Sequence, residues 1–256
     1  MLKNFSVRNY RQFNEILKFD LSASNYAFNT NCIKNGLSKL ALIYGKNGSG
    51  KSNIASAMFD LVSHLTDNES NLSKDNYLNA NSSDKYASFI FEFEFSDKYK
   101  NTKSVIYEYQ KDERATLISE NLKIDNQTIV DYKLGQPFFT SLSGAENLNK
   151  NINPAQNLSA IKYIYSNTSL DKRNVVNSIF VKFIEFVNHI LYFRSVFQGN
   201  NFTGYKNGMD NIEQDIIVKN NLKNFEKFLR DFELDFELVK VRQLNRSIIG
   251  IKMEKK

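Results

Sequence analysis

The first 45 residues alternate between short apolar segments and polar turns, a pattern typical of β-strands. Residues 2–8 (LKNFSVR) and 15–21 (EILKFDL) predict two strands, joined by the polar turn 9–14. Residues 40–44 (LALIY) form a continuous apolar run with no polar alternation. Such a run is expected of a strand buried on both faces, so we predict that 40–44 is a buried central strand.

A helical period follows this run. Apolar side chains recur at three- and four-residue spacing, at Ile54, Met58, Leu61, Val62 and Leu65. This spacing predicts a helix from Lys51 to about Thr66. Residues 67–83 are polar, and we predict that they form a loop.

Between residues 86 and 130 the period changes to two. Phenylalanines at 89, 91, 93 and 95 alternate with mostly polar residues, and 103–109 and 115–124 show similar strand-like patterns. We therefore predict an antiparallel sheet with one face exposed. Residues 131–170 contain the only two prolines and predict no clear element.

The C-terminal third predicts helices over 172–197 and 211–232 and strands over 236–242 and 247–253. In the second helix the apolar residues step by four and three: Val218, Leu222, Phe225, Leu229 and Phe232. Two heptads are short for a coiled coil, so we interpret this stripe as a packed core face. The strand-like sequence then stops without a closing helix, and we expect the fold to be incomplete at its C-terminus.

Composition places the chain among ordinary globular proteins. It has 256 residues, 41% hydrophobic and 24% charged, enough for one large domain or two small ones. The single cysteine, Cys32, excludes an intrachain disulfide and fits a reducing compartment. The most apolar run, 183–193, is about half the ~20 residues that a membrane helix needs. No signal peptide is evident, so we expect a cytoplasmic protein without a membrane partner.

The net charge leaves the question of a nucleic-acid partner open. The chain carries +6 at neutral pH, which favours polyanions. However, 26 of its 34 basic residues are lysine, and 34 residues are asparagine. This composition is typical of an AT-rich genome, and arginine, the better reader of phosphates and bases, is scarce.

The most informative motif lies between the apolar run and the helix. It matches G-x-x-x-x-G-K-[ST] and consists of Gly45, Lys46, Asn47, Gly48, Ser49, Gly50, Lys51 and Ser52. Glycines allow positive φ angles and bring backbone N–H groups close to phosphate oxygens. The helix N-terminus adds its positive dipole end. In this chemistry Lys51 binds the β- and γ-phosphates, and the Ser52 hydroxyl binds Mg²⁺.

With its flanks, the motif resembles the phosphate loop of the RecF/SMC-like ABC-type ATPases. Residues 44–53 (YGKNGSGKSN) are similar to that family's GxNGSGKSN, and residues 2–13 (LKNFSVRNYRQF) are similar to its opening strand and corner. Within this class the chain most resembles prokaryotic "AAA family" ATPases of the OLD-like or abortive-infection type. The resemblance is specific over residues 1–66. It implies an N-terminal ATPase lobe with an antiparallel β arm, ATP and Mg²⁺ as cofactors, Asn53 in the binding loop, and Arg11 near the nucleotide.

Hydrolysis in that family also needs a signature motif and a Walker B acid pair. Residues 142–146 (LSGAE) are close to the signature, but the following sequence is poor in helix formers and broken by Pro154. We interpret this match as a coincidence. The acids Asp97 and Asp235 follow stretches that are half-polar or too short for Walker B. Two residues are possible for the Q-loop position, Gln110 and Gln136.

Other candidate catalytic residues have simpler explanations. His189 lies in an apolar helical stretch, and a structural role is favoured. His64 is near the end of the phosphate-loop helix, where a positive charge is favourable. Cys32 lies in a polar loop without the context of a nucleophile, and Asp112-Glu113 fits a solvated surface.

Taken together, the sequence predicts an α/β fold of mixed α+β character. We expect a P-loop ABC-type lobe with an antiparallel β arm and a helical segment. The predicted regions are an ATPase core (1–83), the β arm (84–170), and a helical segment followed by terminal strands (171–256).

The predicted function is an ATP-binding lobe whose ATP-dependent association is coupled to DNA transactions or phage defence. Expected partners are a second copy bound through the nucleotide face, DNA, or a nuclease-type effector. The alternative is a regulatory module that binds nucleotide without hydrolysing it. A P-loop kinase is disfavoured, since its lid needs paired arginines and the chain has 8 scattered ones.

Overall fold

The chain divides into two compact units, Met1–Asn207 and Gly208–Lys256, which are described separately. The computed structural model describes residues 1–23, 30–66, 76–195, 202–205, 216–231, 233–243 and 246–252. Residues 67–75 of the predicted polar loop, and the start of the predicted helix 211–232, lie outside the described residues.

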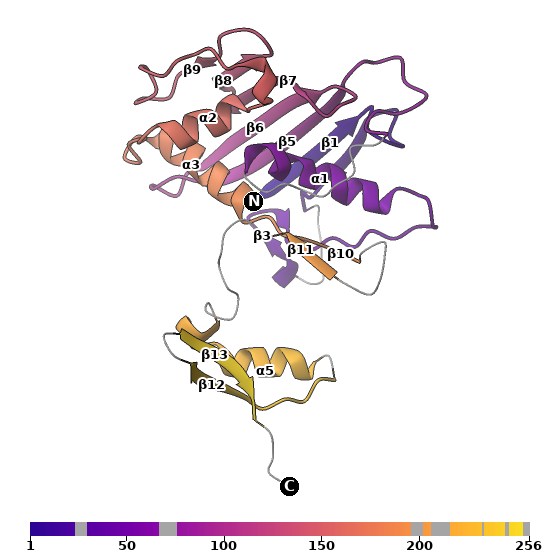
Figure 1. Cartoon of the computed structure of the whole chain (residues 1–256), viewed down its shortest axis with the longest axis vertical. Coiled ribbons are helices and arrows are strands. Elements are labelled where there is room, and N and C mark those ends of the chain that lie inside the picture. Colours follow the sequence, from indigo (N-terminus) through magenta and orange to yellow (C-terminus); the bar gives the residue numbers. More distant parts are fainter. Residues whose placement is uncertain are drawn as a thin grey trace. The chain divides into compact units, whose positions relative to one another are not determined.

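A seven-stranded antiparallel sheet forms the first unit, in the order β2-β1-β5-β6-β7-β8-β9 (Figure 1). Its strands are β1 (Leu2–Arg8), β2 (Leu17–Asp20), β5 (Ala87–Ser96), β6 (Thr102–Lys111), β7 (Leu117–Ile124), β8 (Gln127–Lys133) and β9 (Phe139–Thr140). The predicted N-terminal hairpin and the predicted antiparallel arm are therefore present. Because β1 pairs directly with β5, a single sheet spans the expected division at residue 83.

Three helices lie on one face of this sheet (Figure 1): α1 (Lys51–Leu65), α2 (Ala160–Asn167) and α3 (Val175–Asn188). Short elements complete the unit: the 3-10 turns Thr30–Cys32 and Pro154–Gln156, the pair β3 (Ile33–Lys34) and β4 (Leu37–Ser38), and the pair β10 (Tyr192–Ser195) and β11 (Phe202–Tyr205).

The core lies between the sheet and the helices, as the period of two predicts. Phe89, Phe91 and Phe93 are buried, whereas Ile90 between them is exposed. The Phe89 ring stacks on that of Tyr109 of β6, with centroids 4.7 Å apart. Helix α3 contributes Phe183, which meets Phe93 edge-on at 5.4 Å. Alternating aromatic residues thus give the sheet one apolar face, and the helices bury it.

Residues 40–44 do not form the predicted central strand. Leu42 is 84% exposed and Tyr44 94% exposed. A central strand needs a hydrogen-bonded neighbour on each side. Among the described residues, no strand pairs with residues 40–44. The strands that precede this run pair with other strands: β1 pairs with β2 and β5, and β3 pairs with β4. The parallel sheet expected of a P-loop lobe is likewise not present among the described residues, whose strand pairs are all antiparallel.

The helix predicted over 172–197 is shorter than expected. The Asn174 side chain accepts hydrogen bonds from the backbone N–H groups of Val176 and Asn177, so it caps the start of α3. The helix ends before His189, and the aromatic residues that follow form β10. No helix among the described residues combines the length and apolar character that crossing a bilayer requires.

Helix α2 was not predicted, although two sequence signals mark it. The Ser159 hydroxyl caps the helix by accepting from the backbone N–H of Lys162. Ile161 and Ile164, three residues apart, are both buried. The turn Pro154–Gln156, which precedes the helix, makes this short pattern hard to recognise in the sequence.

The second unit consists of α5 (Leu222–Arg230) and a hairpin of β12 (Leu238–Gln243) and β13 (Arg246–Ile251) (Figure 1). The hairpin agrees with the two predicted terminal strands. The predicted helix 211–232 is interrupted, because Asn220 adopts a positive φ and its N–H bonds to Ile217 O at 3.2 Å. Val218, before this break, is 79% exposed, and Leu222, Phe225 and Leu229 are half-buried, so the predicted core face is not buried; Phe232 lies outside the described residues.

Candidate functional site

The loop that matches the phosphate-binding motif, residues 45–52, lies directly before and at the start of α1. Gly48 and Gly50 have φ angles of +81° and +97°, which side chains with a Cβ rarely adopt. The Ser49 N–H bonds to Lys46 O at 3.2 Å and closes the turn. Two of the three glycines of the motif, Gly48 and Gly50, therefore have the left-handed backbone conformation that favours glycine.

Lys51 folds back over the loop. Its ammonium donates to Gly45 O at 2.7 Å and to Lys46 O at 2.8 Å. These bonds hold the positive charge among the loop carbonyls, in an exposed position. An incoming phosphate oxygen is a stronger acceptor for an ammonium than a carbonyl is, because it carries a charge.

Helix α1 presents an uncapped N-terminus to the loop. Its N-cap residue, Gly50, makes no side-chain hydrogen bond, and no acidic residue lies in the first turn. An uncapped helix start offers N–H groups and a positive dipole end to an anion. Ser52 is exposed in this first turn, where its hydroxyl is available to a metal ion.

The β1–β2 corner lies against the same turn of the helix. Arg11 Nη1 donates to Asn53 Oδ1 at 3.4 Å, and Asn53 Nδ2 donates to Gln12 Oε1 at 2.9 Å. The structure thus brings Arg11, inferred from the family resemblance, next to the loop. Gln12 was not singled out from the sequence, and only its place in the corner points to it.

Backbone strain in this corner is offset by hydrogen bonds. Arg11 has a φ of +50°, a conformation that side chains rarely adopt. Its N–H donates to Tyr77 O at 3.0 Å, and its carbonyl accepts from Asn79 Nδ2 at 2.6 Å. Asn79 N also donates to the Oδ1 of buried Asn9 at 3.1 Å. The corner is therefore held in a defined position beside the loop.

Gly50 and Gly48 provide a matched pair for testing this packing. A Cβ on Gly50 would lie 1.7 Å from Gln12 Nε2, whereas a Cβ on Gly48 would meet nothing within 4 Å. Both alanine variants incur the left-handed penalty of about 1 kcal/mol. We expect Gly50→Ala to destabilise the protein more than Gly48→Ala in urea unfolding. Adding Gln12→Ala should remove the excess, and equal losses in the two single variants would contradict this packing.

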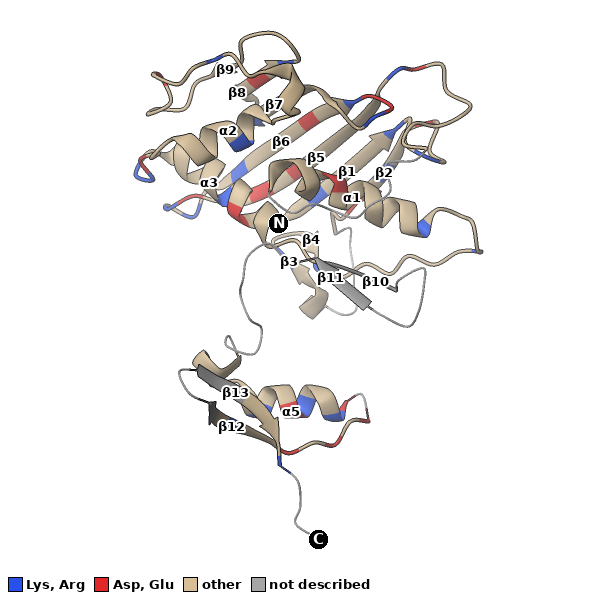
Figure 2. Ribbon diagram, in the orientation of Figure 1, with Lys and Arg blue, Asp and Glu red and all other residues tan. Residues whose placement is uncertain are grey.

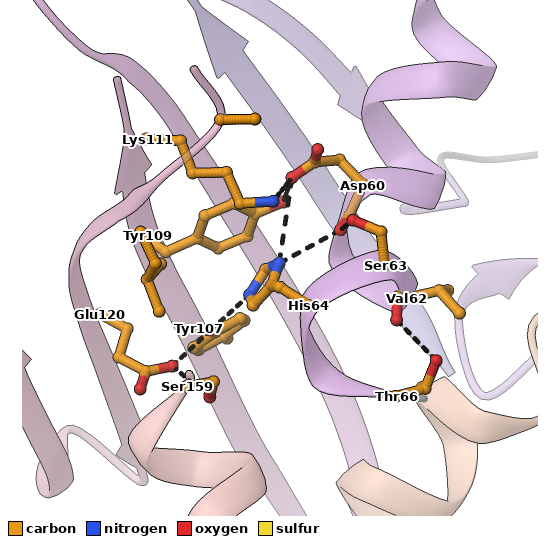
Figure 3. Close-up of polar contacts among 12 residues, drawn as sticks. Asp60, Val62, Ser63, His64, Thr66, Tyr107, Tyr109, Lys111, Glu120 and Ser159 are labelled. Atoms are coloured by element: carbon orange, nitrogen blue, oxygen red, sulfur yellow. Dashed lines mark hydrogen bonds and ion pairs between the residues drawn. The ribbon is translucent and has the colours of Figure 1, made fainter. Parts of the chain in front are cut away.

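The other end of α1 is anchored to the sheet by a buried carboxylate. Asp60 Oδ2 accepts from Lys111 Nζ at 2.7 Å and from Tyr109 Oη at 2.9 Å (Figure 3). Its Oδ1 accepts from Tyr77 Oη at 3.0 Å. Burial and the negative charge of Asp60 raise the pKa values of both tyrosines, so their hydroxyls stay protonated as donors. The phosphate-loop helix is thus fixed at both ends.

His64 does not act as the favourable charge at the helix C-terminus that was predicted. Its imidazole is buried between α1 and the tyrosines of β6, with its ring centroid 4.4 Å from that of Tyr109. Burial, together with the positive charge of Lys111, lowers the pKa of His64 well below its ordinary value. This burial could not be predicted, because Tyr107, Tyr109 and Lys111 are distant from His64 along the chain.

The weaker sequence candidates have structural roles. Asp97 Oδ1 accepts from the backbone N–H groups of Tyr99 and Asn101, both at 2.8 Å, and so forms the β5–β6 turn. Asp235, in the second unit, pairs with Arg230 at 3.2 Å. Residues 142–146 form a turn with no helix after it, as expected of a coincidental match. Cys32 is a free thiol. Among the described residues, no three His, Cys, Asp or Glu side chains are grouped closely enough to bind a metal.

Basic residues of the first unit are spread over strands, helices and loops, interspersed with acidic ones (Figure 2). Several are paired: Lys3 with Glu94, Arg8 with Asp84, Lys103 with Asp125. Several basic side chains of this unit are therefore paired locally with carboxylates.

Comparisons with protein-family models and with curated proteins find no match for this chain.

Proposed function

We propose that this chain binds Mg-ATP through the loop Gly45–Asn53, as the nucleotide-binding lobe of a RecF/SMC-like ABC-type ATPase. In this proposal the loop amides and Lys51 bind the phosphates and Ser52 is a Mg²⁺ ligand. The ion itself supplies charge neutralisation at the phosphates. ATP-dependent association would then serve DNA transactions or phage defence.

One observation carries the proposal: a complete G-x-x-x-x-G-K-S loop has left-handed glycines and leads into an uncapped helix N-terminus. The uncapped amides, the lysine and the serine hydroxyl are the chemistry that polyphosphate and Mg²⁺ need. The corner at Arg11 and Gln12 supports the same function, since it fixes Asn53 beside the loop. Calorimetric titration with Mg-ATP is the direct test.

The exposed run 40–44 supports association with a partner. Its apolar side chains are exposed immediately before the loop. Exposed contiguous apolar side chains are typical of surfaces that are covered in an assembly. We propose that ATP binding and association involve this same region, with a second copy as the partner.

The alternative function is a nucleotide-binding module without hydrolysis. It is favoured by the positions of the two acidic residues considered for Walker B, Asp97 and Asp235. Asp97 is engaged in a turn, and Asp235 is 85% exposed in the second unit. Hydrolysis needs a carboxylate to orient water and a second protein ligand for Mg²⁺. Neither role has a clear residue among the described ones.

We therefore expect this chain alone to bind ATP and to release phosphate very slowly. Each missing electrostatic or positioning group costs on the order of 10²–10⁵ in rate. A phosphate-release assay measures this, with Lys51→Ala as the control for contaminating ATPases. Turnover of about one per second that disappears in Lys51→Ala would contradict the expectation. Asp97 and Asp235 would then be the first residues to replace.

A further inference from the structure

A chain of short polar contacts runs through the core from α1 to α2 (Figure 3). His64 Nδ1 lies 3.1 Å from Asp60 O, and His64 Nε2 lies 2.8 Å from Tyr107 Oη. Tyr107 Oη lies 2.7 Å from Glu120 Oε2. All three contacts are within hydrogen-bond distance, and the residues that form them come from α1, β6 and β7.

The far end of this chain is tied to the start of α2. Glu120 Oε2 also accepts from the Ser159 hydroxyl at 2.8 Å. Glu120 Oε1 accepts from the backbone N–H groups of Ala160 and Ile161. These donors occupy Oε1, so a proton on the carboxyl group belongs on Oε2, which faces Tyr107.

This series of contacts needs one more hydrogen atom than a neutral Tyr107 and a neutral His64 supply. Three contacts need three hydrogens. The Tyr107 hydroxyl supplies one and a neutral His64 imidazole supplies one. With Glu120 ionised, one of the three contacts would bring two lone pairs together in a buried place, which costs the free energy of an unmade hydrogen bond.

We propose that Glu120, Tyr107 and His64 share one titratable proton, and that this proton fastens α1 and α2 to the sheet. It resides either on the carboxyl group of Glu120 or on the imidazole of His64, with Tyr107 donating in the opposite direction. In both arrangements all three contacts are hydrogen bonds. The device does not depend on the proposed nucleotide function, although it holds the helix that carries the phosphate loop.

The surroundings limit how this proton titrates. Charged or titratable side chains face the three residues from each packed element: Asp60 on α1, Tyr109 and Lys111 on β6, Tyr132 on β8, and Lys162 on α2. Lys111 and Lys162 disfavour an imidazolium, and burial lowers the pKa of His64 and raises that of Glu120. These effects favour the proton on Glu120.

The sign of the pH dependence follows from proton counts in the two states. In the unfolded chain, His64 and Glu120 have ordinary pKa values of 6.5 and 4.5. Above pH 6.5 the unfolded pair therefore holds no extra proton, whereas the folded pair holds one. Stability then falls as pH rises, and the unfolding constant grows by up to about tenfold per pH unit.

Glu120→Gln is the decisive variant, because its amide supplies the third hydrogen permanently. Its Nε2 can donate to Tyr107, while its oxygen keeps the bonds from Ala160 and Ile161. We expect urea unfolding of the full chain to show the alkaline decline in the wild type and in Glu108→Gln, a control on the outer face of the sheet. The decline should be absent in Glu120→Gln.

Spectroscopy locates the proton directly. At pH 7 we expect either the infrared band of a protonated carboxyl group, lost in Glu120→Gln, or a ¹⁵N spectrum showing His64 as imidazolium, with His189→Gln used for assignment. A neutral His64 together with no protonated carboxyl band would overturn the proposal. So would a Glu120→Gln protein that fails to fold, or one that keeps the alkaline decline of the wild type.

Discussion

Lys51→Ala is expected to lower Mg-ATP affinity about a hundredfold without unfolding the protein. In the proposed complex, Lys51 makes charge-assisted hydrogen bonds to the β- and γ-phosphates, and two such bonds contribute about 3 kcal/mol. A loss of this size corresponds to about two orders of magnitude in Kd. In the free protein the ammonium donates to the carbonyls of Gly45 and Lys46, in an exposed position. Removing it should change stability by less than about 0.5 kcal/mol.

Lys46→Ala is the matched control for this titration. Lys46 lies in the same loop, is exposed and carries the same charge, but the motif gives it no phosphate contact. Calorimetry should therefore show a much smaller change for Lys46→Ala, measured at the same ionic strength. Equal affinities of the wild type and Lys51→Ala would refute the binding site. Equal losses in both variants would indicate general attraction of the nucleotide to positive charge.

Local patterns predicted much of this fold correctly. The alternation of Phe89, Phe91 and Phe93 identified β5 and its buried face, and the spacing from Ile54 to Leu65 identified α1. Each of these elements buries one apolar face against neighbouring elements that also have one apolar face. The position of a turn directly before α1 was also predicted, because the motif that indicates it lies within eight consecutive residues.

Features that depend on distant residues could not be predicted. Residues 40–44 have the composition of a buried strand, but burial also requires paired neighbours, and composition carries no information about them. Asp60 and His64 are spaced like ordinary residues of a helix. Their partners on β6 and β7 become visible only when the sheet register is known. The same holds for Gln12, which reaches Asn53 across 41 residues.

The second large effect concerns stability and the buried pair of Lys111 and Asp60. Lys111→Met should lower the free energy of unfolding by about 3–5 kcal/mol, because it leaves a buried carboxylate without its cation. The side chains of this pair are 4% and 9% exposed. Urea unfolding at fixed pH measures the loss. Asp60→Asn in the Lys111→Met background should restore most of it, since no charge remains buried, the amide oxygen can accept from one of Tyr77 and Tyr109, and the amide nitrogen can donate to the other hydroxyl.

The first unit contains a close control for this experiment. Lys103, on the same strand β6, contacts Asp125 at the same 2.7 Å, but these side chains are 27% and 43% exposed. Solvent screens this pair, so Lys103→Met should cost much less stability than Lys111→Met. The two variants remove the same group from the same strand at the same distance, and burial is the main difference between them. Similar losses for both would show that Asp60 does not depend on Lys111, and that its two tyrosine hydroxyls are sufficient to hold the carboxylate in the core.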